Sequence, residues 1–552
     1  MSARQRDWAA GGVIFLLLAV RACAFGVRYW PQLDDYIQYH NYAAGFTFPE
    51  LVEAVGILAS RPLAGIADYF VWSPLFDHMI VGVVIISALY AASAVMMKGL
   101  LSRYVAVGPL FLVVMALLPL GVEGTYWMSA STRVVVGLLC ACLAGWSFAW
   151  WLDRGGWYRG VLFAAVVLLP FGFYEQSAVL AMTVVLGMGI LEFRRHRGRA
   201  LLALWSLPAA LLYLKLTTLL AVDGLYGSRT RLMLPVSSYY WDTFLPDILG
   251  QIGTVFSQGT FYTLVKGFVR GMRMVLSGEL LIWFGAAALL CLLYGWLMWR
   301  GGEERTGVRG TPLALLTGLL LAVAPVTPFL ILENPWFSLR GAVTAFAGIA
   351  LICDRVFVLL TALIPRRREA RAVLVGLSAL VFCVAGASEI GDYRDTWQND
   401  QTAARAVLQT MEQDFPGESG QDVQVGVLGM EPSRLPNQNF YWHEHIHGCT
   451  ESAWAFSGLL KWAAGEQTLP SVTPLPTDPV YRAWNRESNR VDRFDAVYYY
   501  DGEGLERVTL EQTGEMDYEV YGQDGRWMGR IWEEELIGYF RTPEQLAGEK
   551  SG

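Results

Sequence analysis

The apolar segment WAAGGVIFLLLAVRACAF, residues 8–25, is followed shortly afterwards by the tetrapeptide LDDY, residues 33–36. The first segment is about long enough to cross a lipid bilayer. Because Arg4 and Arg6 precede it, the positive-inside rule places the N-terminus in the cytoplasm and the two aspartates at the outer surface. Carboxylates are costly to hold at the edge of a membrane, so this pair indicates a functional position.

The amino-acid composition indicates that most of the chain, and not only the first segment, lies in a membrane. The 552 residues are 54% hydrophobic and 16% charged, with a mean hydropathy of +0.37, which is too apolar for a soluble protein of this size. Residues 391–552 hold 28 acidic and 13 basic side chains, a net charge of −15, whereas the whole chain carries −7 and residues 1–390 therefore carry +8. The sequence thus predicts a membrane module, residues 1–390, and a soluble acidic domain, residues 391–552.

Hydropathy predicts about eleven membrane spans. Basic residues concentrate in every second connection, and an odd number of spans then places the C-terminal domain outside the cell. We therefore expect a polytopic α-helical protein of the cell membrane, multi-pass, with a cytoplasmic N-terminus and an extracytoplasmic C-terminal α/β domain. The predicted spans lie at residues 8–26, 78–97, 104–121, 134–152, 160–173, 177–193, 200–221, 279–299, 312–332, 342–363 and 372–390.

The regions outside these spans are predicted in less detail. Residues 28–77 and 223–278 are expected to be long outer loops. In the C-terminal domain, the patterns predict a helix at 403–411, strands at 423–428 and 494–500, and a hairpin over 518–532 that turns at Asp524-Gly525. The proline-rich stretch 470–479 is expected to be a loop.

Acidic residues gather at the predicted outer ends of the spans: Asp34 and Asp35 after the first, Glu123 after the third, and Glu175 between the fifth and sixth. If these ends converge, one carboxylate could act as a general base that takes a proton from an acceptor hydroxyl or amine. Two neighbouring carboxylates could also hold a divalent cation. The alternative is that these acids only solvate the helix ends.

Cations are scarcer on the predicted outer face. Arg61 lies in the first outer loop and Arg340 lies between the ninth and tenth spans. An outer arginine can bind the phosphate of a lipid carrier through charge-assisted bonds and stabilise it as a leaving group. The alternative for both is snorkelling towards lipid headgroups, which we expect for Lys266, Arg270 and Arg273.

Half of the six histidines lie in the motif HEHIHGC, residues 443–449. Alternating histidines can share one face of a strand and bind zinc, but no matching ligand cluster occurs elsewhere in the domain. We therefore expect no metal at this motif, and an alternative is a loop that contacts substrate. The chain has no Walker sequence and no dinucleotide-binding glycine pattern, so a cytosolic nucleotide is not expected as a substrate.

These motifs resemble those of the GT-C superfamily of integral-membrane glycosyltransferases. The resemblance rests on Leu33-Asp34-Asp35-Tyr36 after the first span, Ser60-Arg61-Pro62-Leu63 in the first outer loop, and Glu123 followed by Tyr126-Trp127-Met128-Ser129. It covers residues 8–390 and implies a polyprenyl-phosphate-linked sugar donor, transfer at the outer face, and a catalytic base at Asp34 or Asp35.

We therefore expect a membrane glycosyltransferase that moves a sugar from a lipid-phosphate carrier to a cell-envelope acceptor, which is a glycan, a lipid or a protein. Its predicted substrate-binding residues are Arg61, Glu123, Tyr126, Trp127, Glu175 and Arg340. No nucleic acid is expected as a partner. The alternative is a transporter or flippase of lipid-linked glycans, but such a protein should place ionisable residues near the middle of the membrane, whereas these gather at the outer ends.

Overall fold

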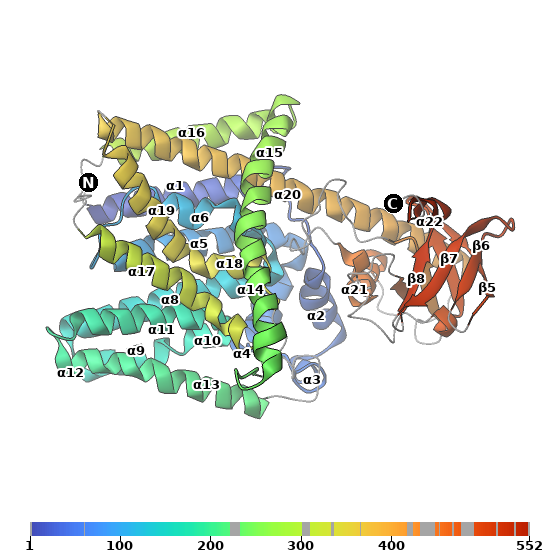
Figure 1. Cartoon of the computed structure of the whole chain (residues 1–552), viewed down its shortest axis with the longest axis horizontal. Helices are drawn as coiled ribbons and strands as arrows, with labels where there is room; N and C mark the ends of the chain where they lie inside the picture. Colours follow the sequence, from blue (N-terminus) through green and yellow to red (C-terminus); the bar gives the residue numbers. More distant parts are fainter. Residues whose placement is uncertain are drawn as a thin grey trace. The chain divides into compact units, whose positions relative to one another are not determined.

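The computed structural model describes residues 3–59, 61–220, 232–300, 310–332, 336–364, 366–416, 423–430, 448–451, 453–465, 469–475, 491–514, 517–534 and 537–549. These residues form two compact units (Figure 1). Unit 1 comprises Met1–Tyr29 and Thr47–Gly391, and unit 2 comprises Trp30–Phe46 and Asp392–Gly552. The segment that holds Asp34 and Asp35 therefore belongs to the same unit as the C-terminal region.

Unit 1 is a bundle of apolar helices, as expected for a membrane-embedded protein (Figure 1). Within the described residues, eight helices are long and apolar enough to cross a membrane: Pro62–Leu101, Met128–Arg154 (α8), Glu175–Glu192 (α11), Arg197–Thr217, Leu281–Arg300 (α16), Thr311–Leu330, Leu339–Thr361 and Arg367–Asp414 (α20). The apolar helices Phe111–Tyr126 and Trp157–Phe173 are shorter. Helix α1 (Ala3–Ala22) is long enough but carries four charged residues.

The polytopic helical class predicted from hydropathy is therefore confirmed, because each of the eleven predicted spans overlaps a helix of this bundle. Three of the eleven fall on helices that are shorter or more charged than the other eight, so the number of spans stays a prediction. The first of the eight starts at Pro62, well before the predicted start at residue 78, because short helical turns continue the chain upstream of α5 (Met79–Leu101).

The described part of the second predicted outer loop is largely helical. Helices α14 (Leu245–Thr254) and α15 (Gly267–Leu276) lie in line and run crosswise to the bundle (Figure 1). Arg270 in α15 does not simply reach towards solvent, since its Nη2 donates to Oε1 of the buried Glu389 at 2.7 Å. Its predicted snorkelling role is therefore wrong, and the arginine fastens the crosswise helix to α20.

Two adjacent buried charges in α19 (Phe346–Thr361) have structural partners. The Asp354 carboxylate accepts the N–H groups of Gly108 and Leu110, at 2.6 and 3.1 Å. The Arg355 guanidinium donates to the carbonyl of Ala106 at 3.2 Å. These bonds satisfy backbone groups in the connection that leads into α6 (Phe111–Leu117), so both charges organise a turn of the chain.

Helix α20 has 48 residues and would be about 72 Å long, more than twice the ~30 Å hydrocarbon core of a bilayer. Only its apolar part, near residues 372–390, fits a membrane span. Asp392, Arg394 and Asp395 follow this part and mark its end. The remainder of α20 belongs to unit 2 and includes the helix predicted at 403–411.

Unit 2 contains two four-stranded sheets. The first has the order β2-β1-β3-β4, in which β1 (Gln424–Leu428) is parallel to β2 (Ser471–Pro474) and β3 (Ala496–Tyr500), and β4 (Leu505–Arg507) is antiparallel to β3. The second is an antiparallel meander of β5 (Thr509–Gln512), β6 (Tyr518–Tyr521), β7 (Trp527–Glu534) and β8 (Ile537–Arg541). A shared apolar core, with Val497, Val520 and Phe540 at its centre, packs the strands together.

Most of the strand predictions for this unit are confirmed. β1 and β3 fall on the predicted strands, and the hairpin of β6 and β7 turns at Asp524-Gly525, where Gly525 has a φ of +77°. The loop predicted at 470–479 is wrong in part, because β2 occupies Ser471–Pro474. β2 lies at the edge of its sheet, where a proline without an N–H is tolerated. Residues 476–479 lie outside the described part of the chain.

Candidate functional site

An ion pair in unit 1 joins two of the predicted site residues. Arg61, just before α4 (Pro62–Ala67), donates from Nε and Nη2 to the Glu175 carboxylate, at 3.0–3.2 Å. The guanidinium also lies over the ring of Tyr174, 4.7 Å from its centroid. Both side chains are about a quarter exposed, so a ligand can reach the pair. The Nη1 group of Arg61 makes no hydrogen bond with the described residues, so its two N–H donors can bind a ligand.

A close approach between helices makes this pairing feasible. A Cβ built on Gly172, in α10 (Leu169–Phe173), would lie 2.5 Å from Leu63 Cγ. The absence of a side chain at this position lets α4 pack on α10, which brings Arg61 beside the first turn of α11. Sequence separation gives no hint of this contact, since the two charges are 114 residues apart.

A second ion pair lies nearby and was missed in the sequence. Arg133 in α8 donates from Nη2 to the buried carboxylate of Asp68 and from Nη1 to the carbonyl of Ser129. It lies close enough to Arg61 for the two like charges to act on each other. A signal was present, because Arg133 is an arginine at the predicted outer end of a span, where the positive-inside rule does not expect one.

A third polar group of unit 1 is built around Glu123, in α7 (Val122–Tyr126). We refer to this group and the two ion pairs together as the cluster. The buried Glu123 carboxylate accepts the main-chain N–H of Arg340 at 3.2 Å, and the Arg340 guanidinium lies 5.3 Å from the ring centroid of Trp127. A Cβ on Gly124 would lie 2.7 Å from Val343 Cγ2 and 3.1 Å from Arg340 Cα. Glycine at this position therefore lets α18 (Leu339–Ala342) approach α7 closely enough for the hydrogen bond.

The aromatic residues of this group are buried and fixed in place. Tyr126 is 2% exposed and packs on Tyr29, with ring centroids 5.3 Å apart. The Tyr29 hydroxyl accepts the N–H of Met128 at 2.9 Å, which holds the break between α7 and α8. Tyr126 and Trp127 therefore form a rigid wall behind Arg340.

Some buried polar groups beside these residues have no hydrogen-bond partner in the described part of the chain. They include Nε2 of Gln176, the residue after Glu175, and Oγ of Ser338, two residues before Arg340, and Oγ of Ser177 is a third such group. Buried polar groups are nearly always paired in folded proteins, so such atoms point to a water or ligand that completes the site. The cluster as a whole offers guanidinium groups, carboxylates and aromatic faces, a set suited to an anionic, hydroxyl-rich ligand.

Asp34 and Asp35 lie in unit 2, and their surroundings differ sharply. Asp35 is fully buried, and its Oδ2 accepts the N–H of Gln32 at 2.9 Å, a contact typical of a helix N-terminus. Asp34 is partly exposed and accepts a 3.4 Å hydrogen bond from Gln38 Nε2. Leu33, before them, has a φ of +39°, a left-handed conformation that costs a non-glycine residue about 1–2 kcal/mol.

Asp35 belongs to a buried polar cluster that was also missed. Burial raises the pKa of the Tyr36 hydroxyl, and the nearby Cys449, Asp400 and Asp35 add to the effect. Burial also raises the pKa of Asp400 to about 7, against the hydrogen bond that its Oδ2 accepts from the Cys449 N–H at 2.9 Å. The Tyr36 ring packs on Trp462, with centroids 5.4 Å apart. These contacts connect residues 30–46 with Asp400, Cys449 and Trp462 of the same unit.

Within the residues that the structure describes, no group of three or more histidines, cysteines or acids could hold a metal ion. The histidines of the motif at 443–447 lie outside those residues, so the expectation of no metal there stays a prediction. Comparison with protein-family models gives no match, and comparison with curated proteins gives none either.

Proposed function

We propose that this membrane protein is a glycosyltransferase of the GT-C type, which moves a sugar from a polyprenyl-phosphate-linked donor to a cell-envelope acceptor. The observation that supports it best is the cluster of Arg61, Arg133 and Arg340 among the carboxylates and aromatic residues of unit 1. Guanidinium groups among carboxylates and aromatic rings are suited to a phosphate that gains negative charge during the reaction. In this proposal the cluster lies at the outer face, with the N-terminus in the cytoplasm and the C-terminal domain outside.

The reaction breaks the bond between the anomeric carbon and the phosphate oxygen and forms a bond from that carbon to an acceptor oxygen or nitrogen. The departing polyprenyl phosphate keeps the electron pair, and Arg61 and Arg340 stabilise its charge. Glu175 and Glu123 fix these two arginines, while Tyr126 and Trp127 shape the pocket. Preorganised donors of this kind contribute ~10²–10³ each to the rate of comparable reactions.

The acceptor proton passes to a carboxylate, and we assign this role to Asp34. A general base has to reach the acceptor, and Asp34 is partly exposed whereas Asp35 is fully buried. Asp35 is then a positioning residue that orders the start of the helical segment through the N–H of Gln32.

The alternative is a transporter or flippase of lipid-linked glycans, which should carry functional charges deep within its spans. The buried charges Asp354 and Arg355 instead bind backbone groups of the connection before α6. This structural role supports the enzyme over the transporter.

The test uses the full-length protein in liposomes with a polyprenyl-phosphate-linked sugar and a cell-envelope extract as the acceptor source. Arg61→Gln should lower transfer by about 10²-fold. The matched control is Arg103→Gln, because Arg103 forms a similarly exposed ion pair with Asp153 after the other end of the span Pro62–Leu101. Equal activity of the two variants would contradict the donor site, and movement of the donor across the bilayer without transfer would favour the transporter.

A further inference from the structure

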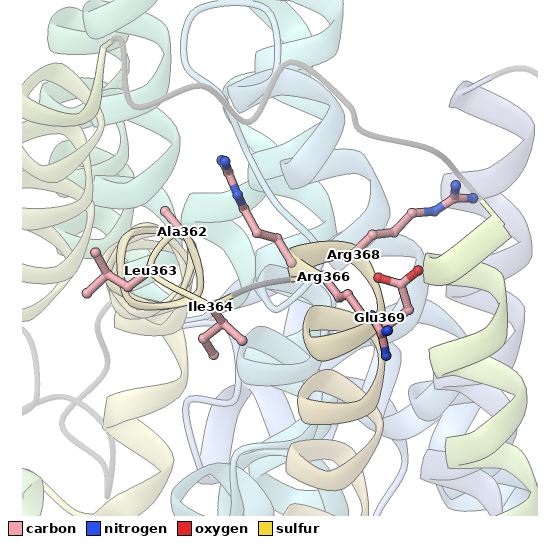
Figure 2. A pocket seen from close by; sticks show the side chains of 7 residues that line it. Ala362, Leu363, Ile364, Arg366, Arg368 and Glu369 are labelled. Carbon is pink, nitrogen blue, oxygen red and sulfur yellow. The ribbon is translucent and has the colours of Figure 1, made fainter.

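A hollow of about 560 Å³ opens where α19 ends and α20 begins (Figure 2). It lies at the opposite end of the span Leu339–Thr361 from Arg340, so it is separate from the cluster of Arg61, Arg133 and Arg340, which we call the donor cluster. Its lining residues are Ala362, Leu363, Ile364, Arg366, Arg367, Arg368 and Glu369.

Three arginines and one glutamate give this hollow a net positive charge. Arg368 is held in place, since its Nε donates to the carbonyl of Trp299 at 2.5 Å and its guanidinium lies 5.5 Å from the Trp299 ring centroid. The side chains of Arg366 and Arg367 are exposed and make no hydrogen bond or ion pair with the described residues. Two guanidinium groups are therefore available to bind an anion.

The other wall of the hollow is apolar and exposed. Leu363 is 84% exposed and Ile364 is 38% exposed, and Leu360, one turn earlier in α19, is 62% exposed. Leu360 lies in α19, whereas Leu363 and Ile364 lie in the turn that follows it at the end of the span, and exposed apolar side chains grouped in this way are suited to contact with lipid chains. The hollow thus joins a cationic wall to a lipid-facing surface, and a phospholipid with an anionic headgroup matches both parts.

The turn itself is anchored independently of the two available arginines. Arg371 donates from Nε to Thr361 Oγ1 at 2.8 Å and from Nη2 to the carbonyl of Val358 at 3.2 Å, which fastens α20 to the end of α19. Arg366 has a φ of +57°, a conformation that glycine adopts more easily than arginine. Its side chain is therefore not required for the turn, and it can be removed without disturbing the fold.

We propose that this hollow binds the phosphate headgroup of an anionic phospholipid through Arg366 and Arg367, with the acyl chains along Leu360 and Leu363. The bound lipid is a structural ligand of the membrane module and is distinct from the sugar donor. A free phosphate ion shares the headgroup chemistry but would gain nothing from the apolar wall.

The test measures retention of phosphatidylglycerol by the full-length protein in detergent, using native mass spectrometry. Arg366→Gln with Arg367→Gln should lower the apparent affinity about 30-fold, because each basic residue near an anionic lipid contributes ~1 kcal/mol, or about fivefold. Arg366→Gly should lower it about fivefold while the melting temperature stays the same or rises. The matched control is Arg194→Gln with Arg195→Gln, which removes two exposed arginines after α11.

Loss confined to the variants at 366 and 367 supports the site. Equal loss in the control pair would mean that the lipid responds only to the overall positive charge, and would overturn the proposal. A second arm adds inorganic phosphate or glycerol 3-phosphate at the same concentration as phosphatidylglycerol. If either displaces phosphatidylglycerol at the lipid's own concentration, the site takes free phosphate and the lipid assignment is wrong.

Discussion

Replacement of Gly124 by alanine should separate α18 from α7 and disturb the proposed donor cluster. The new Cβ would lie 2.7 Å from Val343 Cγ2 and 3.1 Å from both Cα and the carbonyl oxygen of Arg340. A side-chain rotation can relieve only the first of these contacts, because the other two involve backbone. The α18 backbone therefore has to move by a few tenths of an ångström.

The cost of this change has two parts. Overpacking of this kind typically costs ~1–3 kcal/mol. The 3.2 Å hydrogen bond from the Arg340 N–H to the buried Glu123 carboxylate is already long, and losing a hydrogen bond at a buried carboxylate costs ~1–3 kcal/mol more. Alanine regains up to ~1 kcal/mol through its higher helix propensity. We therefore expect a net destabilisation of about 1–6 kcal/mol, together with a clear fall in sugar transfer as the Arg340 backbone shifts.

The assay compares thermal unfolding of the full-length variants in detergent, followed by sugar transfer in liposomes. Gly187→Ala is the control, because a Cβ at Gly187 in α11 would meet no atom within 4 Å. Adding Val343→Ala to Gly124→Ala should restore part of the stability, since one of the close contacts is then removed. A Gly124→Ala protein that melts at or above the Gly187→Ala protein would refute the close approach of α7 and α18.

Three further outcomes are expected. Asp34→Asn should lower transfer by ~10²–10⁴ and Asp35→Asn should lower it less, because only the first removes the proposed base; equal losses in the liposome assay would contradict this assignment. The raised Asp400 pKa of about 7, against 3.8 for an ordinary aspartate, means that the folded state binds the proton more tightly, so stability falls as pH rises from about 4 to 7. Asp400→Asn should remove up to ~4 kcal/mol of this fall. The prediction would be disproved if the melting temperature of this variant changed between pH 5 and pH 8 by as much as that of the native protein. A cysteine introduced at Gly502 should react with a membrane-impermeant reagent on intact cells, whereas protection would reverse the proposed orientation.

Hydropathy predicted the helical membrane class because long apolar segments have few alternatives in a bilayer. It gave no helix bounds for the region 223–278, where α14 and α15 are joined through π-helical turns at Val255–Gly259 and Phe261–Lys266. Each such turn adds a residue and shifts the helix face, so the apolar faces of α14 and α15 do not continue as one 3.6-residue pattern through the turns.

The candidate site shows a different limit of sequence reasoning. Charge at the predicted outer ends identified Arg61, Glu123, Glu175 and Arg340 as individual residues, but not their partners. The pairing depends on contacts between helices that glycines permit, and no local pattern encodes such contacts. The unequal burial of Asp34 and Asp35 was also beyond the sequence, because it arises from packing within unit 2, whose two segments lie far apart in the chain.

Unit 2 is built from two segments that lie far apart in the chain, and this has a consequence for biosynthesis. The segment Trp30–Phe46 leaves the ribosome early, but its packing partners begin at Asp392. Synthesis of the intervening stretch, about 350 residues, takes roughly 20–70 s at ~5–20 residues per second. Throughout this interval the aspartate pair lacks its native surroundings. The proposed enzyme therefore acquires its catalytic base only when the last part of the chain has emerged, and a truncated chain that inserts correctly into the membrane should remain inactive.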